Sequence, residues 1–389
     1  MTKKILYVRT GPYDLNINSY NVQEVGLAKA FCRLGYNIDV IVFKKKHPKQ
    51  WTFFEYNDCK AKWIEKRRFR WFRWGINLSI CKDEFLLQYD YVISSEYMQL
   101  QTYLLSRKVK NMFIYNGPYY NLFMFKWISP IYDYLFTQKL NKAVKHIFTK
   151  SILAENYLKQ KGYTNIRTVG VGLDTERFDN NEEINLETKL IVKFMTYNKC
   201  LLYVGALSER KNYRFMLQVY AKVLEYDPTI KFVVIGKSKS SPYYKLIGKS
   251  DNDYEKKCMS NLPLEVKKGV YRIEKIDNSQ LKYIYPLAKA FLLPSTFEIF
   301  GMVLMEAMYL GAPVITSENG GSMTLIHGKE TGQIVKEFNS DKWSEAVIKY
   351  LTDTDYTKQI IYNAQMLIRE EYNWNVIAQK MNNIMNKFE

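Results

Sequence analysis

The sequence has few of the residues that hold metal ions or form disulfide frameworks. Its 389 residues include 3 histidines and 5 cysteines, with no CxxC pair and no HxxxH pair. Zinc sites need such close spacings, and a disulfide framework needs a dense, even-numbered set of cysteines, so neither is expected. Five scattered thiols fit a reducing cytoplasm. A hydrophobic share of 47% with 25% charged residues also excludes a disordered or fibrous chain.

Long uncharged apolar runs are missing as well. A membrane-spanning helix needs about 20 such residues, and the nearest candidates, 119–136 and 291–315, each contain two charged residues. The first nine residues lack the apolar core of a signal peptide. We therefore expect a chain that neither crosses a membrane nor is secreted by that route.

Basic residues outnumber acidic residues, and most of the excess lies in the first half of the chain. The chain has 57 Lys and Arg against 39 Asp and Glu, a net charge of +18. Residues 1–180 contain 29 basic and 15 acidic residues (+14), whereas residues 181–389 contain 28 and 24 (+4). The first half is therefore expected to meet something anionic, and nucleic acid, a membrane surface and a phosphorylated substrate all remain open.

Strand and helix patterns alternate along the whole chain, in two successive series. In the first, strands are predicted at 4–9, 38–43, 90–94, 112–115, 146–149 and 166–169, and helices at 22–34, 97–107 and 151–161. In the second, strands are predicted at 200–205, 231–236, 270–276, 290–293 and 313–316, and helices at 212–226, 279–287, 301–310, 340–352 and 355–388. A joint around 172–199 separates the two series.

This rhythm predicts an α/β protein with two doubly wound, Rossmann-like domains facing each other across a cleft. We expect an N-terminal domain over 1–180, a C-terminal domain over 181–372, and a last helix over 373–389 that packs back toward the N-terminal domain. Ligands of such sheets bind beyond the carboxyl ends of the strands. Two sheets therefore favour a transferase with two substrates.

Two carboxylates stand eight residues apart around the start of one predicted helix. Glu298 lies in the loop after a strand, and Glu306 lies inside the helix that begins near Gly301. A helix N-terminus offers backbone N–H groups and a positive dipole end to a pyrophosphate. At such a site Glu306 would accept hydrogen bonds from ribose hydroxyls, and Glu298 from the hydroxyls of a sugar. The alternative is that Glu298 is only a carboxylate at the helix start and Glu306 a solvated helix residue.

These motifs resemble those of retaining glycosyltransferases of family four, which have the GT-B fold. Glu298 and Glu306 match the E-x7-E signature of that family. The segments 202–212, 169–174 and 318–321 are similar, in the same order, to its glycine loop with phosphate-binding Arg and Lys, its interdomain segment and its later glycine pair. The resemblance covers most of residues 1–380 and is strongest in the C-terminal half.

The resemblance implies a role for each matching residue. Arg210 and Lys211 would bind the donor diphosphate and, with Glu298, act in catalysis. Glu306 would bind the ribose and Glu298 the donor sugar. The full donor-binding set would be Gly205, Arg210, Lys211, Phe300, Gly301, Met302 and Glu306. No protein nucleophile, metal or bound cofactor is expected, because the leaving phosphate accepts the proton and fixed cations can replace a metal.

The sequence departs from the family pattern in three places. Ala206 stands where members often have Arg, so Arg210 is the expected substitute. In the N-terminal loop, Asn18, Ser19 and Tyr20 replace a Gly-Gly pair. Asn116 stands where members often have His, so it can bind a sugar but cannot carry a proton. We predict that the acceptor contacts these four N-terminal residues.

The segment 60–74 combines seven cations with three tryptophans, Trp63, Trp71 and Trp74. Its apolar residues follow neither a helical nor a strand period, so it is not interpreted as an amphipathic helix. Trp with Arg is common at lipid headgroups, and the cytoplasmic leaflet is anionic. The same composition would suit single-stranded nucleic acid or a solvated insertion. We expect anionic membrane binding here, with the tryptophans as interfacial anchors.

The sequence as a whole predicts a metal-independent retaining hexosyltransferase. It would transfer from a nucleotide-diphosphate sugar, with UDP favoured, to a lipid-linked or cell-surface polysaccharide acceptor. We expect it in the cytoplasm, peripheral at the inner face of the membrane, and not bound to nucleic acid. A GT-B sugar-nucleotide epimerase is the enzyme alternative, although three scattered histidines supply little acid–base chemistry. A basic nucleic-acid-binding protein would explain the charge but not the Glu298 and Glu306 pattern.

Overall fold

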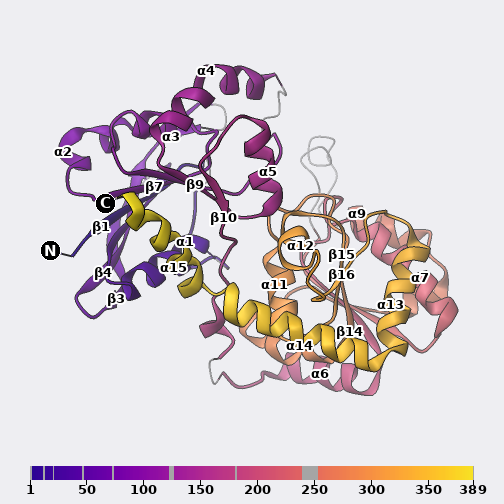
Figure 1. The fold of residues 1–389 in the computed structure, drawn as a ribbon. Coiled ribbons are helices and arrows are strands. Elements are labelled where there is room, and N and C mark those ends of the chain that lie inside the picture. Colours follow the sequence, from indigo (N-terminus) through magenta and orange to yellow (C-terminus); the bar gives the residue numbers. More distant parts are fainter. Residues whose placement is uncertain are drawn as a thin grey trace. The chain divides into compact units, whose positions relative to one another are not determined.

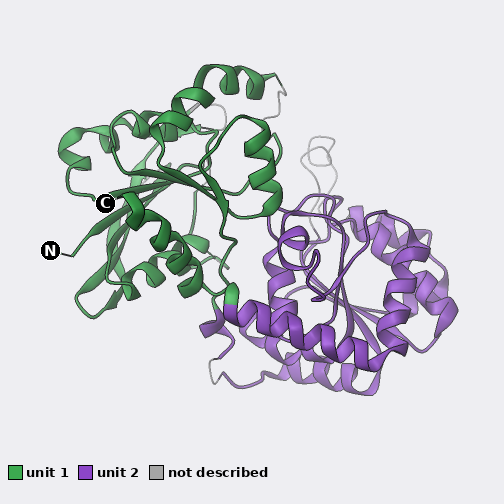
Figure 2. Ribbon diagram, in the orientation of Figure 1, with its two compact units in different colours: residues 1–174, 371–389 green, residues 175–370 purple. Residues whose placement is uncertain are grey.

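The structure is a computed structural model that describes residues 2–11, 14–20, 22–45, 48–71, 74–121, 127–179, 182–238 and 253–388. The chain divides into two compact units (Figure 2). Unit 1 consists of Met1–Asp174 and Glu371–Glu389, and unit 2 consists of Thr175–Glu370.

Unit 1 is built around an eight-stranded sheet with the order β10-β9-β8-β7-β1-β2-β4-β3. All neighbours are parallel except β3, which runs antiparallel to β4. The strands are β1 (Lys4–Arg9), β2 (Asn37–Lys44), β3 (Gln50–Tyr56), β4 (Cys59–Arg67), β7 (Tyr91–Ser95), β8 (Met112–Asn116), β9 (His146–Thr149) and β10 (Ile166–Thr168). A separate hairpin joins β5 (Phe69–Trp71) to β6 (Trp74–Ile76).

Helices cover this sheet (Figure 1). They are α1 (Gln23–Arg33), α2 (Asp83–Leu86), α3 (Leu100–Ser106), α4 (Ile128–Ala143), α5 (Ile152–Gln160) and, from the end of the chain, α15 (Trp374–Met385). Helix α15 packs on α1 so closely that a Cβ on Gly26 would lie 2.1 Å from the Trp374 indole nitrogen. The Tyr36 hydroxyl also donates to Asn382 (2.7 Å). The last helix is therefore an integral part of unit 1.

Unit 2 has a six-stranded, fully parallel sheet with the order β13-β12-β11-β14-β15-β16. Its strands are β11 (Cys200–Val204), β12 (Lys231–Ile235), β13 (Val270–Ile273), β14 (Ala288–Leu293), β15 (Val314–Thr316) and β16 (Gln333–Ile334). Its helices are α6 (Leu186–Tyr197), α7 (Tyr213–Tyr226), α9 (Asp253–Ser260), α10 (Leu264–Gly269), α11 (Met302–Tyr309), α12 (Gly320–Leu325), α13 (Ser340–Thr352) and α14 (Thr354–Glu371).

The central strands are buried on both faces because helices lie on both sides of each sheet. All five residues of β11 are buried, as are the four central residues of β1. Such strands appear in the sequence as continuous apolar runs without alternation. In unit 2 the chain turns outward from β11 in both directions, toward β12 and toward β14. The carboxyl ends of β11 and β14 therefore flank the topological switch point, where α/β sheets bind ligands.

The predicted strands of both series are confirmed, but β3, β16 and the helices α2, α4, α9, α10 and α12 were not predicted. Four predicted segments also differ from the structure. The pattern at 279–287 forms two short 3₁₀ helices, Asn278–Tyr283 and Tyr285–Leu287. The pattern at 355–388 is two helices, and the Asn373 side chain caps the second by accepting the Val376 N–H. The joint 172–199 contains a full helix, α6, and the segment 60–74 contributes β4 and the hairpin.

Candidate functional site

A cluster of three charged residues predicted to bind the donor lies on two loops at the carboxyl edge of the unit 2 sheet. The first loop follows β11 and carries Gly205, Arg210 and Lys211, and the second follows β14 and carries Glu298. The backbone N–H and hydroxyl of Thr296 both donate to the Arg210 carbonyl, at 2.9 and 3.1 Å. Since β11 and β14 are neighbours, these bonds join the loops at the switch point.

Glu298 binds both cations of the first loop through one carboxylate oxygen. Arg210 Nη1 lies 3.1 Å from Glu298 Oε2, and Lys211 Nζ donates to the same atom. Arg210 Nη1 also donates to the Phe297 carbonyl (2.7 Å). The Lys211 side chain is 9% exposed and that of Glu298 16%, whereas that of Arg210 is 50% exposed. The cluster thus has a buried pair and one cation that reaches solvent.

Burial and charge act in opposite directions on this pair. Burial lowers the pKa of Lys211, and the nearby Glu298 carboxylate only partly offsets that effect. Burial also raises the pKa of Glu298, but the charges and hydrogen bonds of Lys211 and Arg210 outweigh it and lower the pKa overall. Glu298 is therefore ionised at neutral pH. The site holds one fixed anion and two cations.

Two glycines let the backbone come close to this cluster. Gly301 precedes α11 with φ of 79°, a left-handed conformation that favours glycine. A Cβ on Gly321, at the start of α12, would lie 1.7 Å from the Phe300 carbonyl oxygen. The Gly320 N–H donates to the Glu298 carbonyl (3.1 Å). The predicted glycine pair is thus packed directly against the Glu298 loop.

Glu306 lies within α11 and is 1% exposed. Burial raises the pKa of its carboxyl well above the ordinary value. A solvated helix residue is therefore excluded. A buried carboxyl is costly unless it serves a purpose, so its presence here is a functional signal.

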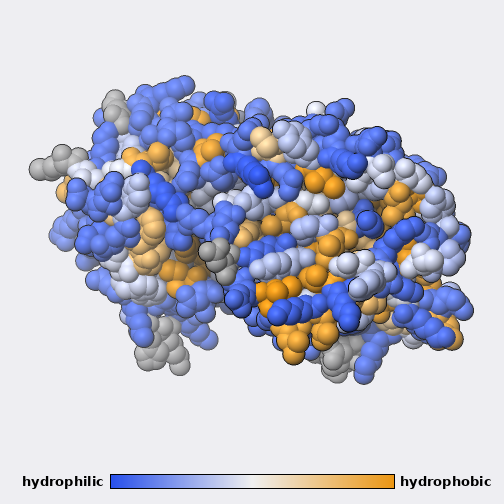
Figure 3. Space-filling model, turned by 90° about the horizontal axis from the view of Figure 1, so that it is seen from below, coloured by the Kyte–Doolittle hydropathy of each residue, from blue (hydrophilic) through white to orange (hydrophobic). Residues whose placement is uncertain are grey.

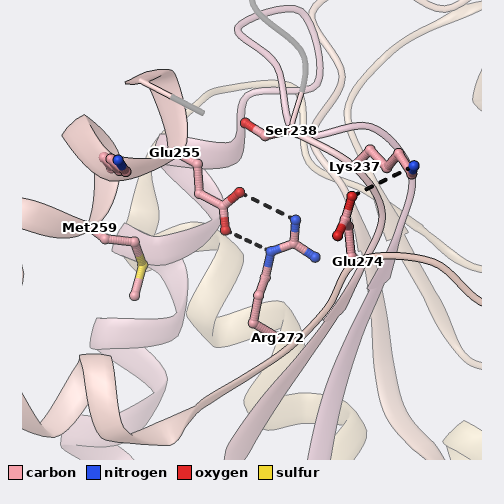
Figure 4. A pocket seen from close by; sticks show the side chains of 7 residues that line it. Lys237, Ser238, Glu255, Met259, Arg272 and Glu274 are labelled. Atoms are coloured by element: carbon pink, nitrogen blue, oxygen red, sulfur yellow. Dashed lines mark hydrogen bonds and ion pairs between the residues drawn. The ribbon is translucent and has the colours of Figure 1, made fainter. Parts of the chain in front are cut away.

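A pocket of about 660 Å³ opens at the carboxyl ends of β12 and β13 (Figure 4). In it the Arg272 guanidinium faces the Glu255 carboxylate, with Nε 2.6 Å from Oε1, and Lys237 Nζ lies 3.6 Å from Glu274. Leu207 N–H, in the loop after β11, donates to the Lys237 carbonyl (2.9 Å). The pocket therefore borders the loop that carries Lys211, but four of its charged groups are already paired with each other.

The predicted acceptor residues lie in unit 1. Asn18, Ser19 and Tyr20 are exposed in the loop before α1, where the Ser19 N–H donates to the Asn16 carbonyl (2.9 Å). Asn116 is fully buried at the end of β8. Its amide donates to the Pro118 carbonyl (3.0 Å) and accepts the Tyr97 N–H (3.2 Å). The Asn116 side chain is thus hydrogen-bonded within the turn that follows β8.

The sequence analysis missed a charged cluster at the carboxyl edge of the unit 1 sheet. Arg9 ends β1, and its guanidinium binds Glu24 (3.1 Å) and Glu96 (3.3 Å). Lys150, just after β9, donates to Gln23 (2.8 Å), and burial lowers the pKa of Lys150 to about 8. The cluster could have been predicted from the positions of these residues, because Arg9, Glu96 and Lys150 each lie at or just after the end of a predicted strand.

The segment 60–74 is less exposed than a membrane anchor requires. Trp63 is fully buried, and Trp74 is 8% exposed and donates its indole N–H to the Met98 carbonyl (2.9 Å). The expectation that these two tryptophans anchor at a membrane is therefore wrong, because they belong to the core. The Trp71 side chain and Arg73 lie outside the described residues. Arg68 also packs inward and donates to the Phe43 carbonyl (2.9 Å).

Within the described ranges, no three His, Cys, Asp or Glu side chains are grouped closely enough to hold a metal ion. The pair Asp251 and Asp253, a DxD-like pattern of the kind that can hold a metal ion, lies at positions whose side chains the structure does not describe. Among the helices of the described part, none combines the length and the apolar character needed to cross a bilayer.

Comparison with known proteins places this geometry in context. The family model for glycosyl transferases group 1 matches residues 188–366, which include Gly205, Arg210, Lys211, Glu298 and Glu306. An uncharacterized glycosyltransferase of Methanocaldococcus jannaschii is 28% identical over 56% of this chain and 53% of its own length. The Staphylococcus aureus capsular polysaccharide biosynthesis glycosyltransferase CapM is 24% identical over 64% and 60%. The chain spans about half the length of the curated relatives first matched.

Solved structures show the fold over nearly the whole chain. Sucrose-phosphate synthase from Thermosynechococcus elongatus matches with a TM-score of 0.69, 17% identity and 99% coverage of both chains. Anabaena HepE in complex with UDP and glucose matches with a TM-score of 0.67 and 14% identity, over 99% of this chain and 100% of that one. The chain has the GT-B fold of two Rossmann-like domains.

Proposed function

We propose that this protein is a retaining glycosyltransferase that moves a hexosyl unit from a nucleotide-diphosphate sugar to a lipid-linked or cell-surface polysaccharide acceptor. The observation that carries the proposal is the cluster of Glu298, Lys211 and Arg210 at the switch point of unit 2. It lies within the segment that matches the group 1 glycosyl transferases. A pair of cations held by one carboxylate suits a ligand with a diphosphate next to a sugar.

The two cations would carry the leaving group. When the bond between the sugar and the diphosphate breaks, negative charge grows on the phosphate oxygens, and fixed cations stabilise it most in a buried site. Lys211 is held at the loop junction by Glu298, and the half-exposed Arg210 would exchange its bonds to Glu298 and the Phe297 carbonyl for a phosphate. The phosphate oxygen then accepts the proton of the acceptor hydroxyl. No side chain forms a bond to the sugar, so the acceptor attacks from the face that the diphosphate leaves.

The two glutamates would bind different parts of the donor. Glu298, which stays ionised, would accept hydrogen bonds from the donor sugar, together with the backbone of Phe300, Gly301 and Met302. Glu306 would accept from the ribose, and Gly205 would let the diphosphate approach the backbone. With two cations available, the reaction would need no metal ion.

UDP is the nucleotide we favour, and the complex of HepE with UDP and glucose supports that choice. A polysaccharide acceptor is supported by the likeness to CapM, whose name places it in capsular polysaccharide biosynthesis. The acceptor would meet unit 1, with Asn18, Ser19, Tyr20 and Asn116 near its path. The +14 charge of residues 1–180 supports a peripheral position on the anionic inner face of the membrane.

The proposal is tested by a transfer assay with anomeric readout. Purified protein is incubated with a panel of UDP- and GDP-sugars and with undecaprenyl-diphosphate-linked oligosaccharides, and products are identified by mass spectrometry and NMR. The expected result is nucleotide release coupled to a new glycosidic bond with the donor's anomeric configuration. An inverted product would refute retention, and epimerised sugar nucleotide without transfer would favour an epimerase.

A further inference from the structure

Helix α4 of unit 1 is apolar on both of its sides. Ile128, Tyr132 and Leu140 lie on the inner side and are 7%, 1% and 0% exposed. On the other side, Trp127 just before the helix, Ile131, Tyr134 and Leu135 are 60%, 50%, 88% and 44% exposed. Their spacing of three or four residues puts them on one stripe. The second half of the helix is polar, but its first half and the preceding Trp127 leave four large apolar side chains exposed to solvent.

The surroundings of this stripe are strongly basic. Residues 97–154 contain eight Lys and Arg and a single acidic residue, Asp133. Asp133 is paired with Lys161. Lys139 and Lys142 are exposed on α4 itself. Exposed Arg107 and Lys110 follow α3, and α3 packs on α4 through Tyr103 and Phe136, whose ring centroids are 4.5 Å apart. The helix that packs on α4 is thus followed by two further exposed cations.

The hairpin β5–β6 adds to the same region of unit 1. The Trp74 ring lies 6.0 Å from the ring of Tyr132 on α4, so the hairpin lies beside this helix. Phe69 on β5 is 69% exposed and Arg70 is also exposed. Trp74 thus places one end of the hairpin against the inner side of α4, while Phe69 and Arg70 lie at the surface on the other strand.

A second exposed apolar stripe, on α6 of unit 2, differs in the charge of the sequence around it. Leu186, Leu190 and Tyr197 are 75%, 58% and 79% exposed along that helix. Seen from below, where α6 and α14 lie in Figure 1, unit 2 shows hydrophobic residues at its surface (Figure 3). Residues 182–199 contain three acidic and three basic residues, so this stripe has no charge preference. The chain therefore provides its own control.

We propose that the α4 stripe (Trp127, Ile131, Tyr134 and Leu135), with the cations around it, docks unit 1 onto an anionic lipid bilayer. Aromatic and aliphatic side chains insert at the boundary between headgroups and acyl chains, while the long Lys side chains reach the phosphates. The surplus of positive charge selects a bilayer over a protein partner of mixed charge. The inference rests on the proposed function only for its purpose, which is access to a lipid-linked acceptor.

Vesicle co-sedimentation of the full chain tests this docking. Vesicles of equal parts phosphatidylcholine and phosphatidylglycerol are compared with pure phosphatidylcholine, and the variant Ile131→Ser/Tyr134→Ser/Leu135→Ser is compared with Leu186→Ser/Leu190→Ser/Tyr197→Ser. The α4 variant should lose about tenfold or more in affinity for the anionic vesicles, and the α6 variant should match the wild type. Lys139→Glu/Lys142→Glu should weaken binding to anionic vesicles alone.

Other outcomes would overturn the docking. These are equal losses in the α4 and α6 variants, unchanged binding of the α4 variant, or no binding by the wild type. A wild-type dimer in sedimentation velocity that the α4 variant abolishes would show a contact between copies instead. Unfolding temperature and thermal shift with UDP-sugar are recorded for every variant. Retained donor binding with lost vesicle binding separates failure of the docking from failure of the proposed function.

Discussion

The two units carry their charge in different ways. In unit 2 the cations at the switch point are bound to a carboxylate within the same pair of loops, as Lys211 and Arg210 are to Glu298. Unit 1 also has a paired cluster, around Arg9, but many of its cations lie unbalanced in sequence and exposed around α4. Paired, buried charge fixes the position of a small ligand, whereas unbalanced surface charge favours a broad anionic surface. The comparison suggests that unit 2 holds the donor and unit 1 meets the acceptor's environment.

Among the substitutions that test the donor role of unit 2, Lys211→Ala is expected to lower kcat the most. The substitution leaves Glu298 buried with Arg210 alone and removes a fixed cation from the leaving group. Loss of one such charge-stabilising group costs about 2.7–4 kcal/mol of barrier, or roughly 10²–10³ in kcat. Arg210→Ala should cost less, because its side chain is half exposed. Steady-state kinetics with an identified donor measures both, with Lys193→Ala on α6 as the control. Kinetics near wild type for Lys211→Ala would contradict the phosphate assignment.

The two glutamates should separate in their effects on binding and turnover. Glu306→Ala would remove the proposed contacts to the ribose, which do not change between ground and transition states. It should therefore weaken donor affinity by about tenfold, or 1.4 kcal/mol. Glu298→Ala removes contacts that strengthen as positive charge develops on the sugar, so it should mainly lower kcat. Donor titration by calorimetry together with kcat decides between them. The reverse pattern would mean that the two roles are exchanged.

A smaller, pH-dependent effect on stability is expected from Glu306→Gln. The folded protein keeps a proton on this buried carboxyl that the unfolded chain releases above a pKa of roughly 4.3. Wild-type stability should therefore fall as pH rises from that value toward the raised pKa of the folded state. The variant has no carboxyl to ionise at this position, so its stability should not fall over this pH range. It should melt at least about 2 °C higher than the wild type at pH 7.5, with a smaller difference at pH 4.5. A constant difference across pH would indicate packing rather than ionisation.

Removal of divalent metal ions is expected to have the smallest effect on the transfer rate. Because Lys211 and Arg210 can balance the diphosphate, transfer should continue at an unchanged rate in excess EDTA. The rate is compared with and without added magnesium or manganese. Activity that disappears with EDTA and returns with either ion would show that the cations of unit 2 are insufficient.

The sequence predicted most of the fold because buried parallel strands appear as uninterrupted apolar runs, such as 200–205 and 231–236. It failed where the signal was weaker. Strand β4 alternates between buried residues and exposed lysines over Cys59–Trp63, but the basic residues after it masked the period. The sequence around helix α6 resembles a connection between domains because one side of the helix is exposed and apolar rather than polar. The 3₁₀ turns at 278–287 contain Pro286, which disfavours a continuous α-helix.

The residues of the candidate site could be predicted from the sequence, but their contacts could not. Glu298, Arg210 and Lys211 follow two strands that are neighbours in the sheet, and their adjacency needs the strand order β11-β14, which one sequence does not state. The spacing also could not show that Glu306 is buried, or that Asn116 uses its amide within a turn. The Arg9 and Glu24 pair joins a strand end to the start of a helix, a contact that only the folded unit defines.

The most direct test is a thermal-shift titration of wild type and Lys211→Ala with a panel of nucleotide sugars. A ligand at 100 times its Kd adds about 2.7 kcal/mol of stability to the protein that binds it, or roughly 5–10 °C for a domain of this size. A UDP-sugar should raise the melting temperature of the wild type by this amount and that of Lys211→Ala by much less. Equal shifts in both proteins, or no shift with any nucleotide sugar, would contradict a donor site at Glu298 and Lys211.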